Sequence, residues 1–412
     1  MGRTGKRTAG DLLGLDAFSL RKMKNIAKLP PHRALLRALR QEMAGGDGAG
    51  LRGAIAQVQD WDDLLQKALA HGVFPSLYRR LADTCPGAAP PEVLAAWRRI
   101  YLVHGRRNLK LTGELLKVLA LFESQGITAI PLKGPVLAHV VYGGIALRQF
   151  YDLDLLVRPQ DMLVVKEVLI SAGYRPLDTL TPKQERLHFK RAYELSFVHP
   201  NLTELDIHWR FPDFLGGGLD ADTAFARKIQ VSLEGKPVYS LAPEDMLLFL
   251  CLHGSFDAWP TLSMVNDVAR LVYSQETWDW TGLMSRADRL GMRRRLLLGL
   301  FLAKELLEAP VPAEVTARAN ADPVLMALYQ QIRGKLLAGS SLETKFGEKN
   351  LFQLKIRERL KDKLAFAWVR TAVSQKADWW WVPLPDYLYW LYPLIRPLRL
   401  TIQYFISAGG RK

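Results

Sequence analysis

Residues 150–157 (FYDLDLLV) have the pattern of a buried β-strand that carries two carboxylates. Side chains alternate across a strand, so Asp152 and Asp154 project from one face while Leu153 and Leu155 point into a core. Two acids on one face of an apolar strand repel each other and resist burial. A divalent cation compensates such a pair, and Mg²⁺ binds through one or two carboxylates, with substrate phosphates and waters as further ligands. The segment therefore predicts a metal-binding strand.

An Asp-x-Asp pair alone also fits a solvated strand end, so the neighbouring sequence has to decide. Upstream, the β-rich stretch 127–132 runs into Lys133-Gly134-Pro135, and a helix is predicted over 136–142. A helix N-terminus offers free N–H groups, glycine lets a phosphate approach the backbone, and Lys133 adds a positive charge. Lys133 and Gly134 are therefore candidate phosphate-binding residues. The alternative is a turn glycine beside a solvated lysine.

Downstream, the stretches 194–199 and 203–209 predict a β-hairpin around a Pro-Asn turn. In its second strand Glu204, Asp206 and His208 share one face. Two-metal chemistry requires a further carboxylate on a neighbouring strand. We therefore predict Asp206 as the third catalytic acid and metal ligand, for Mg²⁺ or Mn²⁺. Glu204 and His208 either support the three aspartates or belong to a wet sheet face.

The remaining sequence predicts an α+β fold, in which a small mixed-sheet core is flanked by N-terminal and C-terminal helical regions. Before the core, apolar residues recur at helical spacing over 61–70, 93–101 and 109–122, with a helix breaker at 85–91, and helical spacing returns after the core. We predict five regions: a basic, flexible N-terminal extension (1–30), a helical region (31–125), the α/β core (126–240), a second helical region (241–335) and a basic, aromatic-rich C-terminal tail (336–412).

The C-terminal tail has the most unusual composition of the chain. It contains Trp379-Trp380-Trp381 and the stretch 387–392 (YLYWLY), followed by prolines and by Arg396 and Arg399. Such a segment fits an aromatic lid packed on the domain, a docking surface for a protein partner, or a membrane headgroup zone. We favour packing or partner docking over peripheral membrane contact. The prolines argue against one continuous amphipathic helix.

The net charge of +15 lies at the ends of the chain: residues 1–40 carry +8 and residues 331–412 carry +9, which leaves −2 for the middle. A protein that grips duplex nucleic acid needs cations around its catalytic face, so duplex nucleic acid is not an expected partner. The two cysteines lie far apart, which argues against a disulfide framework and favours a reducing cytoplasm. The expected location is cytoplasmic, with peripheral attachment at the inner face of the membrane left open.

Several of these stretches, read together, resemble a known bacterial family. The stretch 127–157 (ITAIPLKGPVLAHVVYGGIALRQFYDLDLLV), the later SAGYRP and ELDIHWRF, and the flanking WDDLLQKALAHGVFPSLYRRL and SLAPEDMLLFLCLHG are similar to the bacterial uncharacterised nucleotidyltransferases. That family is a branch of the DNA polymerase β-like superfamily. The resemblance spans roughly residues 55–290.

The resemblance implies roles for particular residues. Lys133 and Gly134 would take the place of the superfamily's phosphate-binding Gly-Ser turn, and the three aspartates would be the metal set. Arg148 matches the family's arginine, and either contacts phosphate or braces the carboxylates by a salt bridge. His188, His253 and Asp267 also fall at family positions. For His253, on an apolar stretch, we favour a core histidine, and we assign Asp267 no catalytic role.

The implied activity is transfer of a nucleotidyl group from an NTP, with ATP the expected donor, to an unidentified acceptor with release of pyrophosphate. A nucleotide-sugar-dependent glycosyltransferase is the enzymatic alternative, because that class also uses Asp-x-Asp to hold Mn²⁺ or Mg²⁺. That class expects a larger parallel sheet before the Asp-x-Asp strand, whereas predicted helix precedes it here. The other alternative is a non-catalytic nucleotide-binding scaffold, against which the three acids argue.

Overall fold

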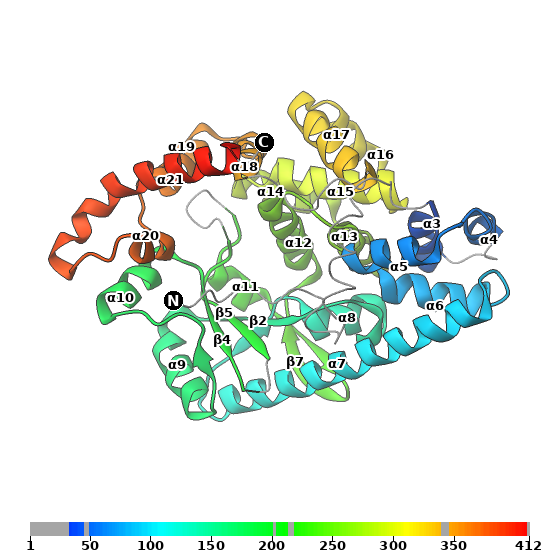
Figure 1. The fold of residues 1–412 in the computed structure, drawn as a ribbon, viewed down its shortest axis with the longest axis horizontal. Coiled ribbons are helices and arrows are strands. Elements are labelled where there is room, and N and C mark those ends of the chain that lie inside the picture. Colours follow the sequence, from blue (N-terminus) through cyan, green and yellow to red (C-terminus); the bar gives the residue numbers. More distant parts are fainter. Residues whose placement is uncertain (1–32, 45–48, 201–202, 213–217, 339–345, 410–412) are drawn as a thin grey trace.

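The computed structural model describes residues 33–44, 49–200, 203–212, 218–338 and 346–409. The predicted N-terminal extension, residues 1–30, lies outside this range. In the described residues the chain forms a small central sheet surrounded by helices (Figure 1). The helices that precede the sheet in sequence and those that follow it cover different parts of the sheet. The predicted α+β architecture, with helical flanks around a mixed sheet, is confirmed.

The central sheet has five strands in the order β1-β2-β5-β4-β3. Strand β2 pairs with β1 antiparallel and with β5 parallel, while β4 pairs antiparallel with both β5 and β3. The predicted hairpin is therefore present as β4 and β5. The strand bounds are β1 Ala129–Pro131, β2 Asp152–Val157, β3 Arg175–Pro176, β4 Glu194–Val198 and β5 Glu204–His208.

One face of this sheet is apolar and covered by two helices, α7 (Pro91–Glu123) and α9 (Met162–Ser171), which lie along its lower side in Figure 1. Leu153 and Leu155 of β2 are fully buried in this layer, as the alternation predicts. Helix α7 joins the two helical segments predicted over 93–101 and 109–122 into one helix of 33 residues. Because α7 and α9 cover one face, the acidic residues of β2 and β5 point to the opposite face.

The N-terminal helices precede α7 and pack at one end of the molecule. The predicted helix 61–70 is present, and Asp60 caps it by accepting a hydrogen bond from the backbone N–H of Asp63 at 2.9 Å. The stretch 85–91 separates it and its neighbour from α7, as predicted. The bounds are α3 Arg33–Ala44, α4 Ala49–Ile55, α5 Trp61–Ala70 and α6 Phe74–Thr84.

Shorter elements connect the sheet. Helix α8 (Gly134–Tyr142) follows β1 and ends where Gly143 takes the left-handed conformation, with φ +75°. The other connecting elements are η1 Ile145–Leu147, η2 Pro159–Asp161, α10 Pro182–Arg191, α11 Ala221–Arg227 and the hairpin β6 Ile229–Leu233 with β7 Lys236–Ser240.

Helices after the sheet form a bundle with one shared apolar core, which includes the N-terminal helices. Helix α15 is buried along most of its length and packs against α12 and α13. The bounds are α12 Pro243–Asp257, α13 Leu262–Ser274, α14 Trp280–Leu290, α15 Arg293–Leu307, α16 Ala313–Asn320 and α17 Pro323–Ala338.

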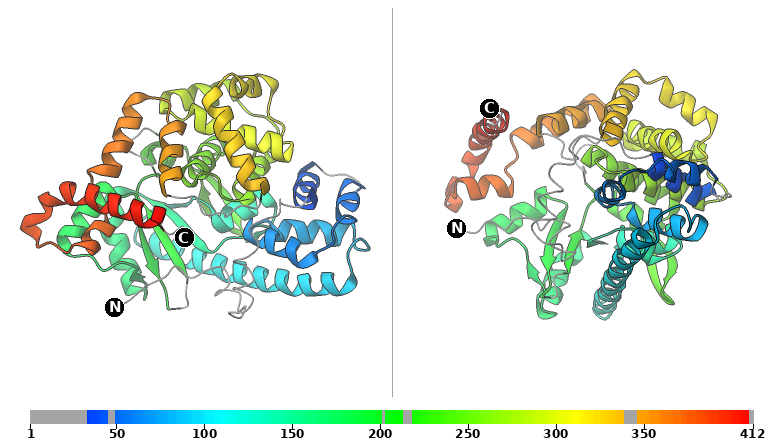
Figure 2. Two further views of the ribbon diagram at one scale, coloured as in Figure 1. Left: turned by 45° about the horizontal axis from the view of Figure 1, so that its top comes forward. Right: turned by 45° about the vertical axis from the view of Figure 1, so that its right-hand side comes forward.

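The C-terminal region folds into further helices that return to the sheet. Both views in Figure 2 place α19 to α21 on the side of α10 and the N-terminal helices at the other end. Arg191 of α10 donates a hydrogen bond to Ser374 at 2.8 Å, and Lys376 pairs with Asp178. The bounds are α18 Phe346–Ile356, α19 Leu360–Thr371, α20 Lys376–Trp381, η3 Asp386–Leu391 and α21 Tyr392–Gly409.

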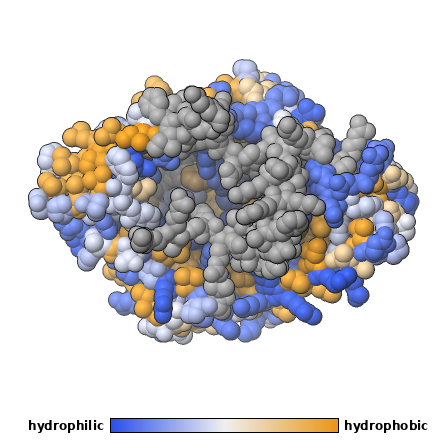
Figure 3. Space-filling view, in the orientation of Figure 1, coloured by the Kyte–Doolittle hydropathy of each residue, from blue (hydrophilic) through white to orange (hydrophobic). Residues whose placement is uncertain are grey.

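As the prolines predict, the aromatic tail is not one continuous helix but is divided into α20, η3 and α21, although Pro397 lies inside α21. Proline there removes one backbone N–H, the one that would bond to the carbonyl four residues earlier. Trp379 is buried, whereas Trp390 and Leu394 are exposed. Figure 3 shows apolar residues gathered at the end of the molecule where η3 and α21 begin. In the described part of the chain, no helix combines the length and apolar character needed to cross a membrane.

Candidate active site

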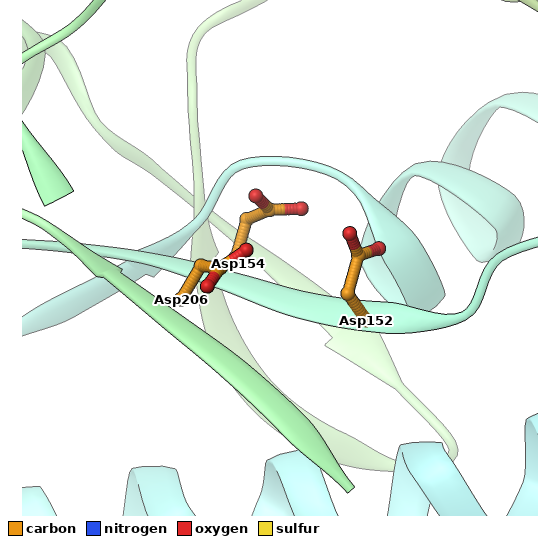
Figure 4. Close-up of side chains that lie close together, drawn as sticks. All are labelled: Asp152, Asp154 and Asp206. Carbon is orange, nitrogen blue, oxygen red and sulfur yellow. The ribbon is translucent and has the colours of Figure 1, made fainter. Parts of the chain in front are cut away.

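Asp152, Asp154 and Asp206 come together on the face of the sheet opposite α7 and α9. Asp154 and Asp206 are direct neighbours in the parallel pairing of β2 with β5. Asp152 lies two residues before Asp154 on the same strand, so all three point to one side (Figure 4). One carboxylate oxygen from each residue lies within 4.8 Å of those from the other two. The structure thus brings together the three acids that the sequence singled out.

The charges of these acids are not balanced within the group. Burial raises the pKa of Asp152, and the nearby Asp154 raises it further. Burial and Asp154 also raise the pKa of Asp206. For Asp154, burial acts in the same direction, but Lys133 and His208 outweigh it and hold the pKa well below its usual value. A cluster of carboxylate oxygens with this surplus of negative charge fits a hard divalent cation such as Mg²⁺ or Mn²⁺.

Lys133 and Gly134 lie beside the acidic end of β2, at the start of α8. The Lys133 ammonium is 3.2 Å from an Asp154 oxygen and is largely buried. Gly134 has φ +60°, a conformation that favours glycine, and a side chain there would approach the backbone oxygen of Asp152 at 3.6 Å. The positive charge of Lys133 therefore lies between the acids and the N-terminus of α8.

His208 supports Asp154 from the neighbouring strand. Its Nε2 lies 3.1 Å from an Asp154 oxygen, and its Nδ1 lies 3.5 Å from a Glu194 oxygen. Burial lowers the pKa of His208, but Asp154 and Glu194 reverse this and raise it. Glu204, in contrast, is exposed and lies beside Asp152 in the strand register. Of the two predicted supporting residues, only His208 therefore contacts the acids.

Comparison with known proteins identifies the family of this chain. The sequence matches the family described as uncharacterised nucleotidyltransferases over residues 57–308, which is more than half of the chain. The chain belongs to this nucleotidyltransferase family. A search of proteins with curated functions found no match.

Among solved structures, this nucleotidyltransferase resembles the lincomycin-bound lincosamide antibiotic adenylyltransferase LnuA, with 21% sequence identity and a TM-score of 0.28. The similarity covers 39% of this chain and 94% of the other. At this level the likeness carries no information about the substrate.

Arg148 in this nucleotidyltransferase forms a bidentate salt bridge with Asp267 of α13. Its Nε and Nη2 each donate to a different Asp267 oxygen at 2.8 Å. The Tyr142 hydroxyl also donates to Asp267, at 2.5 Å. Arg148 therefore forms a salt bridge with Asp267, and not the predicted salt bridge with Asp152, Asp154 or Asp206. It ties the segment before β2 to the helical bundle and fixes the strand that carries Asp152 and Asp154.

Two residues near the site were missed by sequence reasoning. Glu194 lies opposite His208 in the β4–β5 hairpin, and the register of the predicted hairpin already contained that pairing. Arg107 of α7 stacks over the Tyr151 ring at 4.1 Å. Burial lowers the pKa of Arg107, while Tyr151, Asp152 and Glu204 act in the opposite direction. Nothing in the sequence distinguishes Arg107 from the other basic residues of α7.

His253 and His188, the two histidines at family positions, make different contacts. His253 stacks on Phe249, and burial and Lys133 lower its pKa to about 4, so it is neutral near pH 7. His188 is buried and bonds to the backbone oxygen of Glu194 at 2.8 Å. Both observations agree with histidines that hold the structure together around the site.

Proposed function

We propose that this protein transfers a nucleotidyl group from an NTP, with ATP the expected donor, to an acceptor, in a reaction that requires Mg²⁺ or Mn²⁺. The observation that carries the proposal is the convergence of Asp152, Asp154 and Asp206 from β2 and β5. Family membership supports nucleotidyl transfer in general. The choice of metal, donor and acceptor belongs to the proposal, as does a cytoplasmic location.

The three aspartates would hold the divalent ions with their carboxylate oxygens. When bound, such ions neutralise the triphosphate and activate the attacking oxygen. His208 keeps one Asp154 oxygen in a fixed position, and Arg148 fixes β2 through Asp267. Lys133, at the N-terminus of α8, supplies a positive charge and free N–H groups for a phosphate. In this role Lys133 moves from Asp154 to a phosphate oxygen, or contacts both.

The reaction forms one bond and breaks another at the α-phosphorus. A nucleophilic atom of the acceptor bonds to this phosphorus, and the bond between the α-phosphorus and the bridging oxygen breaks. The electron pair of that bond leaves with pyrophosphate, and the acceptor's proton passes to solvent. Catalysis then depends on positioning and on charge stabilisation by the acidic face.

The sheet topology argues against the glycosyltransferase alternative. Only β2 and β5 are parallel among the five strands, and β1 is the sole described strand before β2. A glycosyltransferase of the Asp-x-Asp type is expected to have a larger parallel sheet ahead of this strand. The three acids are instead close enough to one another to hold divalent ions together.

The test is to incubate the protein with each labelled NTP, Mg²⁺ or Mn²⁺ and a panel of acceptors, and to measure pyrophosphate release. Metal-dependent release together with labelled acceptor is the expected result. Sugar transfer from a nucleotide-sugar without pyrophosphate would instead establish the glycosyltransferase. Nucleotide binding without turnover under all conditions would identify a scaffold.

A further inference from the structure

A cavity of about 660 Å³ lies between the start of β4 and the C-terminal helices. One wall comes from the segment that joins α10 to β4, and the opposite wall comes from α18, α19 and α20. Its lining is mostly apolar and includes the aromatic rings of Tyr193, Phe256, Phe366, Trp379 and Trp380. Pockets of this volume and character bind small organic molecules.

The cavity adjoins the acidic face of the sheet through two of its lining residues. Glu194 leaves 35% of its side chain exposed, while one of its oxygens lies 3.5 Å from His208 Nδ1. The Tyr193 ring stacks on the His208 ring, with centroids 6.1 Å apart, and meets Phe256 edge-on at 6.0 Å. His208 in turn contacts Asp154. A single residue therefore separates the cavity wall from the acids.

The lining of the cavity carries more positive than negative charge. Two of its lysines are neutralised, because Lys349 pairs with Asp257 at 2.8 Å and Lys376 pairs with Asp178. The other charged residues of the lining are Arg191, Arg357, Arg370 and Glu194, and Asp378 lies near enough to act on Arg370. Arg191 donates a hydrogen bond to the uncharged Ser374 at 2.8 Å. A ligand with an anionic group balances this surplus.

We infer that this cavity is the acceptor site, and that the acceptor is a small anionic molecule with an apolar or aromatic ring and a hydroxyl group. The inference rests on the proposed nucleotidyl transfer. The ring packs between the aromatic side chains, the anionic group faces the arginines, and the hydroxyl meets Glu194 at the end of the cavity nearest the metal site. A folded protein or a nucleic-acid duplex is too large for this volume.

The C-terminal wall of the cavity lies outside the part of the chain that matches the family. Helices α18 to α20 lie beyond residue 308, where the family match ends. The acidic face, in contrast, lies wholly within the match. Part of the region that selects the acceptor therefore lies outside the family match, whereas the region that carries out the transfer lies inside it.

Anilinonaphthalene sulfonate, an aromatic anion with strong fluorescence in apolar sites, is a suitable probe. We expect saturable binding to the full-length protein and about a tenfold weaker affinity for Ala365→Trp, which fills the cavity from α19. Leu364→Trp adds the same ring at the neighbouring position, which is 61% exposed and outside the lining, and should bind like the wild type. Val369→Trp provides a second filling variant in case Ala365→Trp does not fold. Equal affinity in the filling variants and in Leu364→Trp would overturn the inference.

The charge requirement is tested with phenylnaphthylamine, which keeps the rings of the probe but is neutral. We expect it to bind at least about fivefold more weakly, and we expect Arg191→Gln to weaken the anionic probe about threefold while exposed Lys190→Gln does not. Equal binding of the two probes would contradict an anionic ligand.

Binding of Mg²⁺ and ATP in the same samples separates this inference from the proposed function. An acceptor site must be occupied together with the nucleotide, so Mg²⁺ and ATP should leave probe binding unchanged or strengthen it. Displacement of the probe by Mg²⁺ and ATP would assign the cavity to the nucleotide and overturn the inference. A protein that binds Mg²⁺ and ATP but not the probe also refutes the inference alone. A protein that neither binds nor turns over any NTP refutes the proposed function, and the acceptor role with it.

Discussion

Two buried clusters of charged residues in this molecule differ in the sign of the charge that is in excess. In the C-terminal region Asp378 is fully buried and pairs with both Arg396 and Arg399, each at 2.5 Å. Arg370 also lies near these groups, since Arg396 and Arg399 both lower its pKa in addition to the effect of burial. Three guanidinium groups thus surround one carboxylate.

The acidic face of the sheet has the reverse composition. There Asp152, Asp154 and Asp206 lie together, and Lys133 and His208 are the cations in contact with Asp154. Buried charge is tolerated when opposite charge compensates it. The C-terminal cluster supplies its own cations, whereas the sheet has a surplus of acid that a divalent ion can balance. The first cluster is therefore expected to hold the fold together and the second to perform chemistry.

The largest expected effect is on turnover. Asp154→Asn and Asp206→Asn should each reduce nucleotidyl transfer by at least about a thousandfold, because each removes a metal ligand. Glu167→Gln, which neutralises an exposed acid on α9, is the control and should retain activity. Circular dichroism should show the same fold in all three variants. Near-normal rates in Asp154→Asn would refute the metal assignment.

Asp378→Asn should have the second largest effect, and this effect should be on stability. Removal of one partner from a buried ion pair leaves unpaired charge, which costs about 3–5 kcal/mol. Asp152→Asn should instead change the free energy of unfolding little or increase it, since it relieves repulsion with Asp154. Urea denaturation measures both variants. Equal destabilisation would show that the two clusters do not differ in this way.

A smaller effect on stability comes from His71. This buried imidazole is neutral in the folded protein and therefore needs no charged partner. Burial, with a contribution from Lys67, lowers its pKa to about 4 from the ordinary 6.5. Below pH 6.5 the unfolded chain binds a proton that folded His71 does not bind. Its contribution to stability is therefore complete above pH 6.5 and is lost as the pH falls towards 4.

The loss between pH 7 and pH 5 should be about 2 kcal/mol for this residue. Urea denaturation at the two pH values measures it, and His71→Gln should show a correspondingly smaller loss than the wild type. A variant with the same pH dependence as the wild type would exclude His71 as its source.

The smallest effect should be stabilisation by the metal alone. Millimolar Mg²⁺ should raise the stability of the wild-type protein by about 1 kcal/mol, because it binds the folded acidic face and not the unfolded chain. Thermal unfolding with Mg²⁺ or with EDTA measures this difference. Asp154→Asn should not respond, and an equal response in this variant would place the ion elsewhere.

Much of the fold could be predicted from the sequence, because its strands have strong local patterns. The alternation in 150–157 predicted the strand that carries Asp152 and Asp154, and the hairpin over 194–209 is present as expected. The parallel pairing of β2 with β5 could not be predicted, because the two strands are distant in sequence and no local pattern specifies a partner. That pairing is what places Asp206 beside Asp154.

The contacts around the three acids were harder to predict from the sequence, because they depend on tertiary structure. Arg148 was predicted to contact phosphate or to brace the carboxylates, but its salt-bridge partner, Asp267 on α13, lies 119 residues away in sequence. The helix through Pro397 was missed, because packing of α21 against α19 and α20 opposes the local preference of proline. The cavity was also missed, since four separate segments form its walls.

The register of β5 has a consequence for how this chain tolerates change. Leu205 and Ile207 alternate with Asp206 and point into the apolar layer. Insertion or deletion of one residue within β5 would turn the carboxylate inward and a hydrocarbon side chain outward. Length variation among natural relatives should therefore be absent from this strand, even where point substitutions in it are accepted.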